Sequence, residues 1–306
     1  MNPLHVDVAV IGGSNAGLSA ALALGRARRS VAVIDDSNPR NAPAGHAHNV
    51  YTRDGTPPDE LRRIGRQQLE PYGVHFVKAR VNTVEGSKGA FQLILSDGGE
   101  LTAARLLLAT GVTDDLPNVP GIRESWGKSV FTCPYCHGWE VQDMPLAVLG
   151  DSDMGYGFAR LIQNWSRDLV LVTGGTTSMT DDQLDDLHAR GIDIIEAAIM
   201  EYENHNGELS ALCLSNGQRL ARKAVFMRPL MSLRSNLHKQ LGCALSDDGL
   251  QVVVDEAGQT SVQGVYAAGD MVSPMAAVIM AAASGAKAAG ALNHEFVMAA
   301  PRPEPR

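Results

Sequence analysis

The sequence of 306 residues has little cysteine, few aromatic side chains and too little positive charge for several classes of protein. Four cysteines cannot staple a chain of this length, which excludes a disulfide-rich scaffold. Aromatic residues make up 5% of the chain, so no base-stacking platform is indicated. The formal net charge of −8 disfavours nucleic acid and anionic membranes as main partners. The remaining composition, 44% apolar and 20% charged, is typical of a globular protein large enough for two domains.

The chain also lacks an apolar run of the roughly 18 residues that would cross a bilayer. The best candidate, residues 275–286, ends at Lys287 and is expected to form a packed helix. The N-terminus, residues 1–5, has neither the basic start nor the apolar core of a signal peptide. We therefore expect a cytoplasmic protein that enters no membrane and whose thiols are reduced at rest.

The chain opens with the pattern of a dinucleotide-binding βαβ unit. Its strand, glycine-rich turn, helix and second strand are expected at residues 6–11, 12–17, 18–27 and 31–34. Asp35 follows the second strand, 23 residues after Gly12, and Ser14 replaces the middle glycine of the strict pattern. In such a unit the glycines let the backbone approach a pyrophosphate, and the helix N-terminus offers N–H groups. The carboxylate then accepts a hydrogen bond from a ribose hydroxyl.

The same design recurs 138 residues later in the chain. A strand, a glycine-rich turn and a second strand are expected at residues 146–149, 150–155 and 169–172. Two further segments, residues 106–111 and 264–270, predict a buried strand that turns sharply at a glycine. The sequence therefore predicts an α/β fold with two Rossmann-like dinucleotide-binding domains.

Proline-containing segments indicate where the chain passes between the two domains. Pro117 and Pro120 mark the link out of the first domain, and residues 227–235 mark the link back. We expect a discontinuous first domain formed by residues 1–116 and 242–306, with the second domain at residues 117–241.

The segment Cys-Pro-Tyr-Cys-His at residues 133–137 carries the chemistry of the sequence. Two thiols three residues apart can close a small disulfide loop, because one helical turn brings them together. Pro134 at the first helical position would make Cys133 the cap, so that both sulfurs meet the positive end of a helix. This position favours the thiolate, which is the form that attacks disulfides. His137 can move the proton, since an unperturbed imidazole titrates near 6.5.

Three other interpretations of this motif compete with a redox pair. The pattern is also the attachment signature of c-type haem, which would need an exporting compartment and a haem-sized helical domain. Zinc would need two further ligands, but Cys213 and Cys243 stand alone in the sequence and are interpreted as small buried hydrophobic residues. A purely structural disulfide is not expected in the cytoplasm. The motif therefore favours a redox pair, and no metal site is expected.

The order of these motifs resembles the low-molecular-weight thioredoxin reductases over nearly the whole chain. The shared order is the first glycine-rich turn, Ala109-Thr110-Gly111, Cys-x-x-Cys, the second βαβ unit and Ala267-Ala268-Gly269-Asp270. More narrowly, the chain is similar to the FAD-dependent dithiol oxidases, such as the gliotoxin and holomycin oxidases. The segments that carry this similarity are residues 39–43, His46-x-His48-Asn49, Arg53-Asp54-Gly55 and residues 133–140.

The resemblance implies a tightly bound FAD, a homodimer, a pyridine nucleotide-disulfide oxidoreductase fold and a cysteine pair that faces the isoalloxazine ring. It implies that Cys136 is the flavin-proximal sulfur and that Cys133 exchanges with the substrate. His137 occupies the place where thioredoxin reductases carry an acidic residue. Asp35 would bind the adenosine ribose and Asp270 the ribitol side. The full set of FAD contacts that it implies is Gly12, Ser14, Asn15, Ala16, Gly17, Asp35, Arg40, Asn41, Asn49, Val81, Ala109, Thr110, Gly111, Gly269, Asp270 and Ala277.

One departure from the family concerns the second βαβ unit. NADPH-dependent members carry a His-Arg-Arg run after its second strand, whereas residues 173–179 here are Thr-Gly-Gly-Thr-Thr-Ser-Met. No arginine there can grip a 2′-phosphate, and each such charge-assisted contact is worth roughly 1.5–3 kcal/mol. Asp151 and Asp153 would also repel a pyrophosphate. We therefore expect this domain to be a retained scaffold without functional NADPH binding.

The favoured hypothesis is an enzyme that oxidises a dithiol to a disulfide and passes electrons through FAD to oxygen. The alternative is a thioredoxin reductase that takes electrons from NADPH or from another donor such as ferredoxin. A hypothesis of another class is a non-catalytic flavoprotein that senses redox state. The expected partner is a small-molecule dithiol or a thioredoxin-like protein, and the sequence does not distinguish the two.

Overall fold

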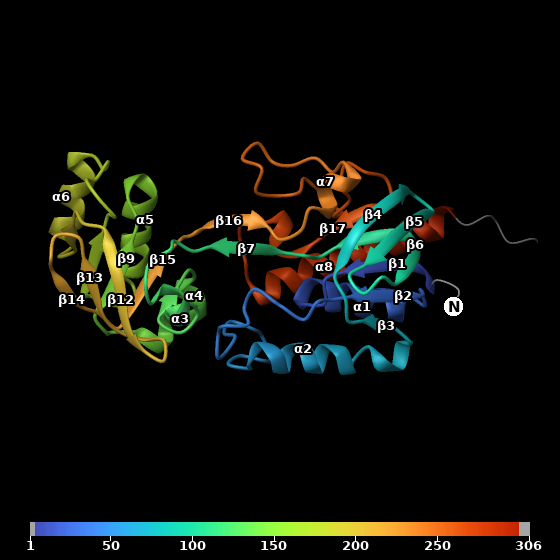
Figure 1. Cartoon of the computed structure of the whole chain (residues 1–306), viewed down its shortest axis with the longest axis horizontal. Helices are drawn as coiled ribbons and strands as arrows, with labels where there is room; N and C mark the ends of the chain where they lie inside the picture. The colour runs from blue at the N-terminus through green and yellow to red at the C-terminus, as the bar shows by residue number, and fades with distance from the viewer. Residues whose placement is uncertain (1–3, 300–306) are drawn as a thin grey trace, which may run out of the picture. The chain divides into compact units, whose positions relative to one another are not determined.

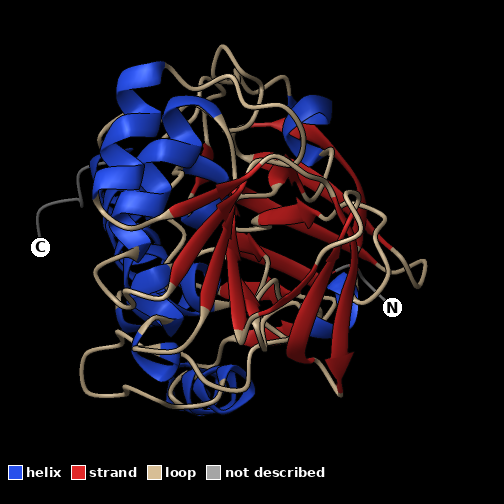
Figure 2. Cartoon of the chain, turned by 90° about the vertical axis from the view of Figure 1, so that its left-hand side faces the viewer, coloured by secondary structure: helices blue, strands red, loops and turns tan. Residues whose placement is uncertain are grey.

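A computed structural model describes residues 4–299 and divides the chain into two compact units. The first unit includes the chain up to Ala42, Val50–Thr113 and the chain from Met231 onwards. The second unit consists of Pro43–Asn49 and Asp114–Leu230. Each unit combines strands and helices in the α/β manner that the sequence predicts (Figures 1 and 2). Residues 300–306 of the expected first domain lie outside the described residues.

The first unit is built on a seven-stranded sheet whose longest strand, β6, has three neighbours. β1, β2, β3, β6 and β17 are parallel to one another, and β5 and β4 extend the sheet in antiparallel fashion. The central strands are almost continuously apolar, as expected for strands that are covered on both faces. The strands are β1 (Leu4–Ile11), β2 (Val31–Ile34), β3 (His75–Val77), β4 (Val81–Ser87), β5 (Ala90–Leu95), β6 (Glu100–Leu108) and β17 (Val265–Ala267).

Two helices, α1 and α8, share one apolar cluster with the strands on one face of this sheet. α1 begins at Asn15, three residues earlier than the sequence predicts, because Ser14 is extended and acts as its N-cap. α8 continues through Lys287, which is exposed, because Ala288, Ala289 and Leu292 carry the buried stripe onward. Among the described residues, no helix has the length and apolar character needed to cross a bilayer. The helices are α1 (Asn15–Arg26), α2 (Pro58–Gln67), η1 (Glu70–Tyr72), α7 (Leu237–Leu241), η3 (Gly269–Val272) and α8 (Val278–Ala299).

The register of the parallel strands aligns their carboxyl ends at one edge of the sheet. Ile11 of β1 pairs with Ile34 of β2 and with Leu108 of β6, and Leu108 also pairs with Ala267 of β17. The segments that follow these four residues therefore emerge side by side. This edge is where open parallel sheets bind their ligands.

The second unit contains a five-stranded parallel sheet in the order β11-β10-β9-β15-β8. A separate antiparallel sheet, β12-β13-β14, packs in the same apolar core as β9 and β15. The strands are β8 (Val130–Phe131), β9 (Leu146–Leu149), β10 (Leu169–Val172), β11 (Asp193–Ile195), β12 (Ile199–His205), β13 (Glu208–Leu214), β14 (Arg219–Ala221) and β15 (Ala224–Met227). The helices are α3 (Ile122–Ser125), α4 (Pro134–His137), η2 (Trp139–Val141), α5 (Ser152–Ile162) and α6 (Asp181–Ala189).

The links between the units differ from the expected boundaries at 116/117 and 241/242. The paired strands β7 (Val112–Asp115) and β16 (Leu230–Leu233) carry the chain out of the first unit and back (Figure 1). α7 belongs to the first unit because Leu237 is buried in that unit's core. The segment Pro43–Asn49, which the sequence assigned to the first domain, groups with the second unit, where Pro43 lies against Gly127.

Candidate active site

The first glycine-rich turn, called the glycine cradle below, has positions that only glycine can occupy. Gly12 follows β1 with φ of +110°, and a Cβ there would stand 2.2 Å from the carbonyl oxygen of Ala109. A Cβ on Gly17 would stand 1.8 Å from the carbonyl oxygen of Gly12. The first turn of α1, with Asn15 and Ala16, therefore lies close to the end of β1.

Asp35 reaches this turn from the end of the neighbouring strand. Its Oδ1 accepts a hydrogen bond of 3.0 Å from the backbone N–H of Gly13. A Cβ on Gly13 would stand 2.8 Å from the Cβ of Asp35, so this contact also depends on glycine. The structure thus joins the carboxylate to the glycine-rich turn, as the spacing of 23 residues between Gly12 and Asp35 predicts.

Two further turns emerge at the same edge of the sheet. Gly111, after β6, has φ of +68°, and the hydroxyl of Thr110 accepts a hydrogen bond of 3.1 Å from Ser235. Gly269, after β17, has φ of +81° and donates its N–H to the hydroxyl of Ser284 at 2.8 Å. Asp270 accepts a hydrogen bond of 3.1 Å from Arg40, so two predicted contacts from distant parts of the sequence form an ion pair.

The other predicted cofactor contacts lie in four places. Asn41 follows Arg40 in the loop after β2, Val81 is the first, buried residue of β4, and Ala277 precedes α8. Asn49 has φ of +58° and lies in the segment that groups with the second unit.

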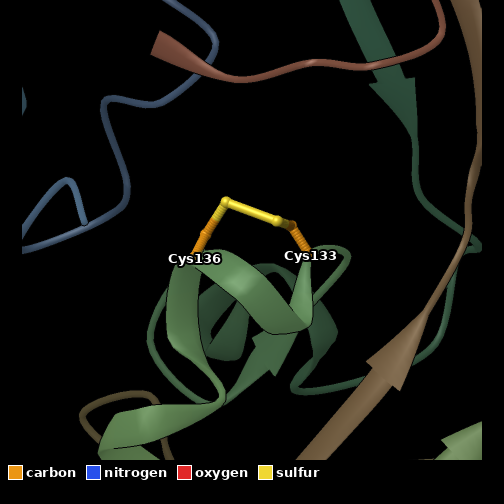
Figure 3. Close-up of a disulfide and its surroundings, with 2 residues drawn as sticks. All are labelled: Cys133 and Cys136. Carbon is orange, nitrogen blue, oxygen red and sulfur yellow. A yellow bond between two sulfur atoms is a disulfide. The ribbon is translucent and has the colours of Figure 1, made fainter. Parts of the chain in front are cut away.

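The cysteine motif follows β8 at the carboxyl edge of the second unit's sheet. Cys133 is extended and acts as the N-cap of α4, and Pro134 is the first helical residue, as the sequence predicts. Cys133 and Cys136 form a disulfide with their Cα atoms 5.3 Å apart. Figure 3 shows the bond bridging the two ends of this single helical turn.

His137 lies in an apolar setting next to the disulfide. Its ring stacks on Phe131 with the ring centres 4.4 Å apart, and neither ring nitrogen has a hydrogen-bond partner among the described residues. Burial, aided by the nearby His48, lowers the pKa of His137 to about 4. The imidazole is therefore neutral at physiological pH while the disulfide is intact, and its unprotonated ring nitrogen can accept a proton.

A second histidine and a carboxylate stand near His137. Nε2 of His48 lies 3.4 Å from Oε1 of Glu140, which is three residues after His137. The ring of His46 lies 6.1 Å from that of His48. The segment Pro43–Asn49 thus brings titratable side chains to the cysteine motif within the second unit.

Aromatic side chains surround the disulfide helix. Tyr135 and Trp139 are 63% and 72% exposed, which is unusual for rings of this size. Trp165 packs edge-on against Tyr135 with the ring centres 5.5 Å apart. Gly138 is needed beneath them, because a Cβ there would stand 2.7 Å from the ring of Trp165.

Comparison with known proteins agrees with this combination of glycine cradle and disulfide helix. The family model for the pyridine nucleotide-disulphide oxidoreductases matches residues 6–289. The chain belongs to this family. It is 30% identical to the thioredoxin reductase sirT of Leptosphaeria maculans, over 96% of this chain and 95% of that protein.

Two solved structures extend the similarity to the whole fold. The structure of HlmI is 41% identical with a TM-score of 0.90, and the alignment covers 96% of this chain and 93% of that one. The putative thioredoxin reductase TrxB of Bacillus anthracis is 35% identical with the same TM-score, over 96% and 99% of the two chains. The protein is therefore a flavin-dependent disulfide oxidoreductase of the thioredoxin reductase type.

Members of this oxidoreductase family bind FAD, and the carboxyl edge of the first unit's sheet fits that cofactor. A Cβ on Gly12 or Gly17 would collide with backbone, so these glycines let α1 approach the end of β1 as closely as a pyrophosphate-binding turn requires. Asp35 supplies the acceptor that a ribose hydroxyl needs. The donor set is that of a dinucleotide site rather than of a metal, and the described residues contain no cluster of three or more His, Cys, Asp or Glu that could hold an ion.

The second glycine-rich turn of this oxidoreductase is tied down by its own carboxylates. Asp151 accepts hydrogen bonds of 2.7 Å from the hydroxyls of both Thr177 and Ser178, and a third from the N–H of Ser178. Burial acts to raise the pKa of Asp151, but these hydrogen bonds outweigh it and lower the pKa to about 2. Asp153 accepts a hydrogen bond of 2.6 Å from Gln183. From the sequence, the two carboxylates are expected only to repel a pyrophosphate. In the structure, Asp151 also holds the segment 173–179 against the turn, and Asp153 bonds to α6.

Sequence reasoning missed two arginines near these sites and misinterpreted one cysteine elsewhere in the second unit. Arg66 of α2 forms an ion pair with Asp35 at 2.9 Å, which no spacing rule connects. Arg228 stands at the carboxyl edge of the second unit's sheet, where its guanidinium lies over the ring of Phe158, 4.6 Å from the ring centre. The interpretation of Cys213 as a buried hydrophobic residue is wrong, because its half-buried thiol donates a hydrogen bond to Glu203 at 3.0 Å. Cys243 is buried.

Proposed function

We propose that the protein oxidises a dithiol to a disulfide through Cys133 and Cys136, with FAD as electron carrier and oxygen as final acceptor. The observation that supports this direction of electron flow is the carboxylate of Asp151 at the second glycine-rich turn. The carboxylate of Asp151 lies next to the segment 173–179, where an NADPH-dependent enzyme needs cationic side chains. The charge repels a pyrophosphate, so the electrons enter from thiols rather than from NADPH.

The proposed turnover balances as two thiol–disulfide exchanges. A substrate thiolate attacks the sulfur of Cys133, the Cys133–Cys136 bond breaks, and Cys136 leaves as a thiolate. The second substrate thiol then displaces Cys133, so the substrate leaves as a disulfide and both cysteines are reduced. The substrate has lost two electrons and two protons. FAD, when bound, accepts the two electrons from the cysteine pair and delivers them to oxygen, which yields hydrogen peroxide.

His137 is the proton acceptor in this scheme. Neither nitrogen of its neutral ring has a hydrogen-bond partner in the part of the chain that the structure describes, so the ring is available to take the proton of an attacking thiol. Once Cys136 becomes a thiolate, the opposite charge favours the imidazolium form and strengthens the base. His48 and Glu140, 3.4 Å apart, provide further titratable groups near the motif.

We propose that FAD is held by the sixteen contacts implied by the resemblance, fifteen of them in the first unit and Asn49 in the segment that groups with the second. Asp35 binds the adenosine ribose and Asp270 the ribitol side. The second unit is a scaffold that carries the cysteine motif and does not use its second glycine-rich turn for NADPH. The enzyme works in the cytoplasm as a homodimer. In support of self-association, Ile279 and Met280 of α8 are 42% and 46% exposed, and a second copy would cover them.

The second candidate function is that of a thioredoxin reductase. The relative from Leptosphaeria maculans carries this name. In that case electrons from NADPH or ferredoxin would reduce the cysteine pair, and a thioredoxin-like protein would be the partner.

For the favoured function, dithiol oxidation, the proposed substrate is a small-molecule dithiol. The exposed rings of Tyr135 and Trp139 offer an apolar surface beside the disulfide for such a substrate.

The proposal is tested by supplying a small dithiol such as dithiothreitol in air and measuring peroxide and disulfide together. We expect about one peroxide per disulfide, and we expect both Cys133→Ser and Cys136→Ser to lose turnover while retaining FAD. Cys243→Ser is the matched control, because Cys243 is buried in the first unit and should not affect the rate. Turnover that survives in either motif variant, or disulfide formed without peroxide, would overturn the proposal.

A further inference from the structure

We propose that Arg66 is a positioning residue for FAD, which fixes the carboxylate of Asp35 for the adenosine ribose. The inference rests on the proposed role of Asp35. Nothing in the pattern Gly-x-Ser-x-x-Gly or in its spacing to Asp35 points to a residue on α2. The ion pair between Arg66 and Asp35 is what connects that helix to the ribose position.

The two oxygens of Asp35 are each held by a different donor. Oδ1 accepts from the N–H of Gly13 at 3.0 Å, and Oδ2 accepts from Nη2 of Arg66 at 2.9 Å. A carboxylate held at both oxygens cannot rotate, yet it retains further lone pairs for a ribose hydroxyl. The Asp35 side chain is 16% exposed, so its carboxylate is largely shielded from water. Rigid placement of a binding group reduces the entropy that a ligand must remove on binding.

The guanidinium of Arg66 also has a donor that the described residues leave unused. Its buried Nε has no hydrogen-bond partner among the described residues, and the same holds for Nη1 of Arg62 one turn earlier. Both arginines line a cavity of about 330 Å³ together with Ser37, which follows Asp35 by two residues. A buried N–H without a partner is costly unless a ligand or water satisfies it. The cavity next to the Arg66–Asp35 pair therefore contains donors that a polar ligand atom or a water molecule can satisfy, although Asp35 itself does not line it.

Arg66 is not required to hold α2 in place. Gly65 packs directly on Leu18 of α1, where a Cβ would stand 2.9 Å from Cδ1 of Leu18. The guanidinium of Arg66 lies over the ring of Phe76, 5.6 Å from its centre, which restricts the direction in which the side chain extends. The Arg66 side chain is itself 40% exposed, so a purely structural ion pair here would contribute little to stability.

The test is a double-mutant cycle on FAD affinity, measured by titrating apoprotein with FAD and following flavin fluorescence. We expect Arg66→Gln to weaken FAD binding about tenfold, and Arg66→Lys to recover part of that loss because it keeps one charged donor. The same Arg66→Gln change in an Asp35→Asn background should cost less than about twofold, since its target is gone. Arg219→Gln is the control, because Arg219 also forms an exposed ion pair, with Glu203, but lies in the second unit and does not line this cavity.

The outcomes separate the inference from the proposal on which it rests. If Asp35→Asn leaves FAD affinity unchanged, the role of Asp35 is wrong. If Asp35→Asn weakens binding but Arg66→Gln does not, or if Arg66→Gln costs the same in both backgrounds, the positioning role is wrong. Should the Asp35→Asn variant hold too little FAD to titrate, FMN decides, because it lacks the adenosine. Arg66→Gln leaves FMN affinity unchanged if it acts at the ribose and lowers it equally if it acts through the fold.

Discussion

At the scale of single residues, the protein depends on groups whose surroundings set their protonation. His137 is stacked on Phe131 and has no hydrogen-bond partner within residues 4–299, and burial lowers its pKa to about 4. Asp151 shows the opposite balance, because hydrogen bonds outweigh burial and lower its pKa to about 2. Both side chains therefore stay in one form at physiological pH: the imidazole is neutral and the carboxylate is charged. The neutral imidazole of His137 can act as a base, and the carboxylate of Asp151 supplies a fixed negative charge.

We predict that His137→Ala slows dithiol oxidation by roughly 10²–10⁴ near pH 7, the span expected for a lost general base. Because the pKa of His137 is lowered, the wild-type base is neutral at every pH above about 4 and becomes protonated below it. The variant should recover rate as the pH rises towards the thiol pKa of about 8.5. The measurement is a pH–rate profile of both proteins.

The control for this profile is His188→Ala, which changes an exposed histidine on α6 and should leave the profile unchanged. A His137→Ala variant that keeps most of its rate at every pH would show that the ring only packs against Phe131 and the disulfide.

At the scale of elements, α8 packs against the first turn of α1, which is part of the proposed FAD site. A Cβ on Gly285 of α8 would stand 2.0 Å from the carbonyl oxygen of Ala16, which lies in the first turn of α1. A side chain cannot enter without moving that turn, and the turn is part of the proposed pyrophosphate cradle. The close packing of α8 on α1 therefore requires a residue without a side chain at position 285, and we expect a larger residue there to weaken cofactor binding as well.

We predict that Gly285→Ala destabilises the protein by about 1–3 kcal/mol and weakens FAD binding, because overpacking displaces α1. Gly290→Ala on the same helix has nothing within 4 Å of the added Cβ, and it should stabilise the protein by about 0.5–1 kcal/mol. Denaturant unfolding with and without FAD measures both changes. If the two substitutions have effects of the same sign, the close contact between the helices is not as described.

At the scale of the whole molecule, the sequence predicts the parts with strong local signals. The two βαβ units follow from apolar runs that end in glycine, and register then aligns Ile11, Ile34 and Leu108 so that their following residues meet. Cys133 as the cap before Pro134 follows from local rules as well. The strand–turn–helix patterns and the cap are set within a few residues of the chain, so a single sequence is sufficient to predict them, whereas the register between strands is set by pairing of distant segments.

The contacts that sequence reasoning misses are set by tertiary packing. Arg66 meets Asp35 across 31 residues, and Arg40 meets Asp270 across 230, and no periodicity links either pair. The hydrogen bonds from Thr177 and Ser178 to Asp151 turn two separately noted segments into one closed structure. The segment Pro43–Asn49 groups with the second unit although its neighbours on both sides belong to the first. Such pairings need the fold before they can be recognised.

The central claim is that thiols, and not NADPH, supply the electrons, and the most direct test follows the flavin absorbance under anaerobic conditions. With millimolar NADPH, the proposal predicts no bleaching of the flavin on the timescale of turnover, because Asp151 and the segment 173–179 offer repulsion and no cationic grip. With a dithiol, it predicts rapid bleaching, followed by reoxidation and peroxide formation when air is admitted. Rapid bleaching by NADPH would contradict the claim and establish the thioredoxin reductase alternative, whereas slow reoxidation in air with fast reduction by ferredoxin would contradict the role of oxygen.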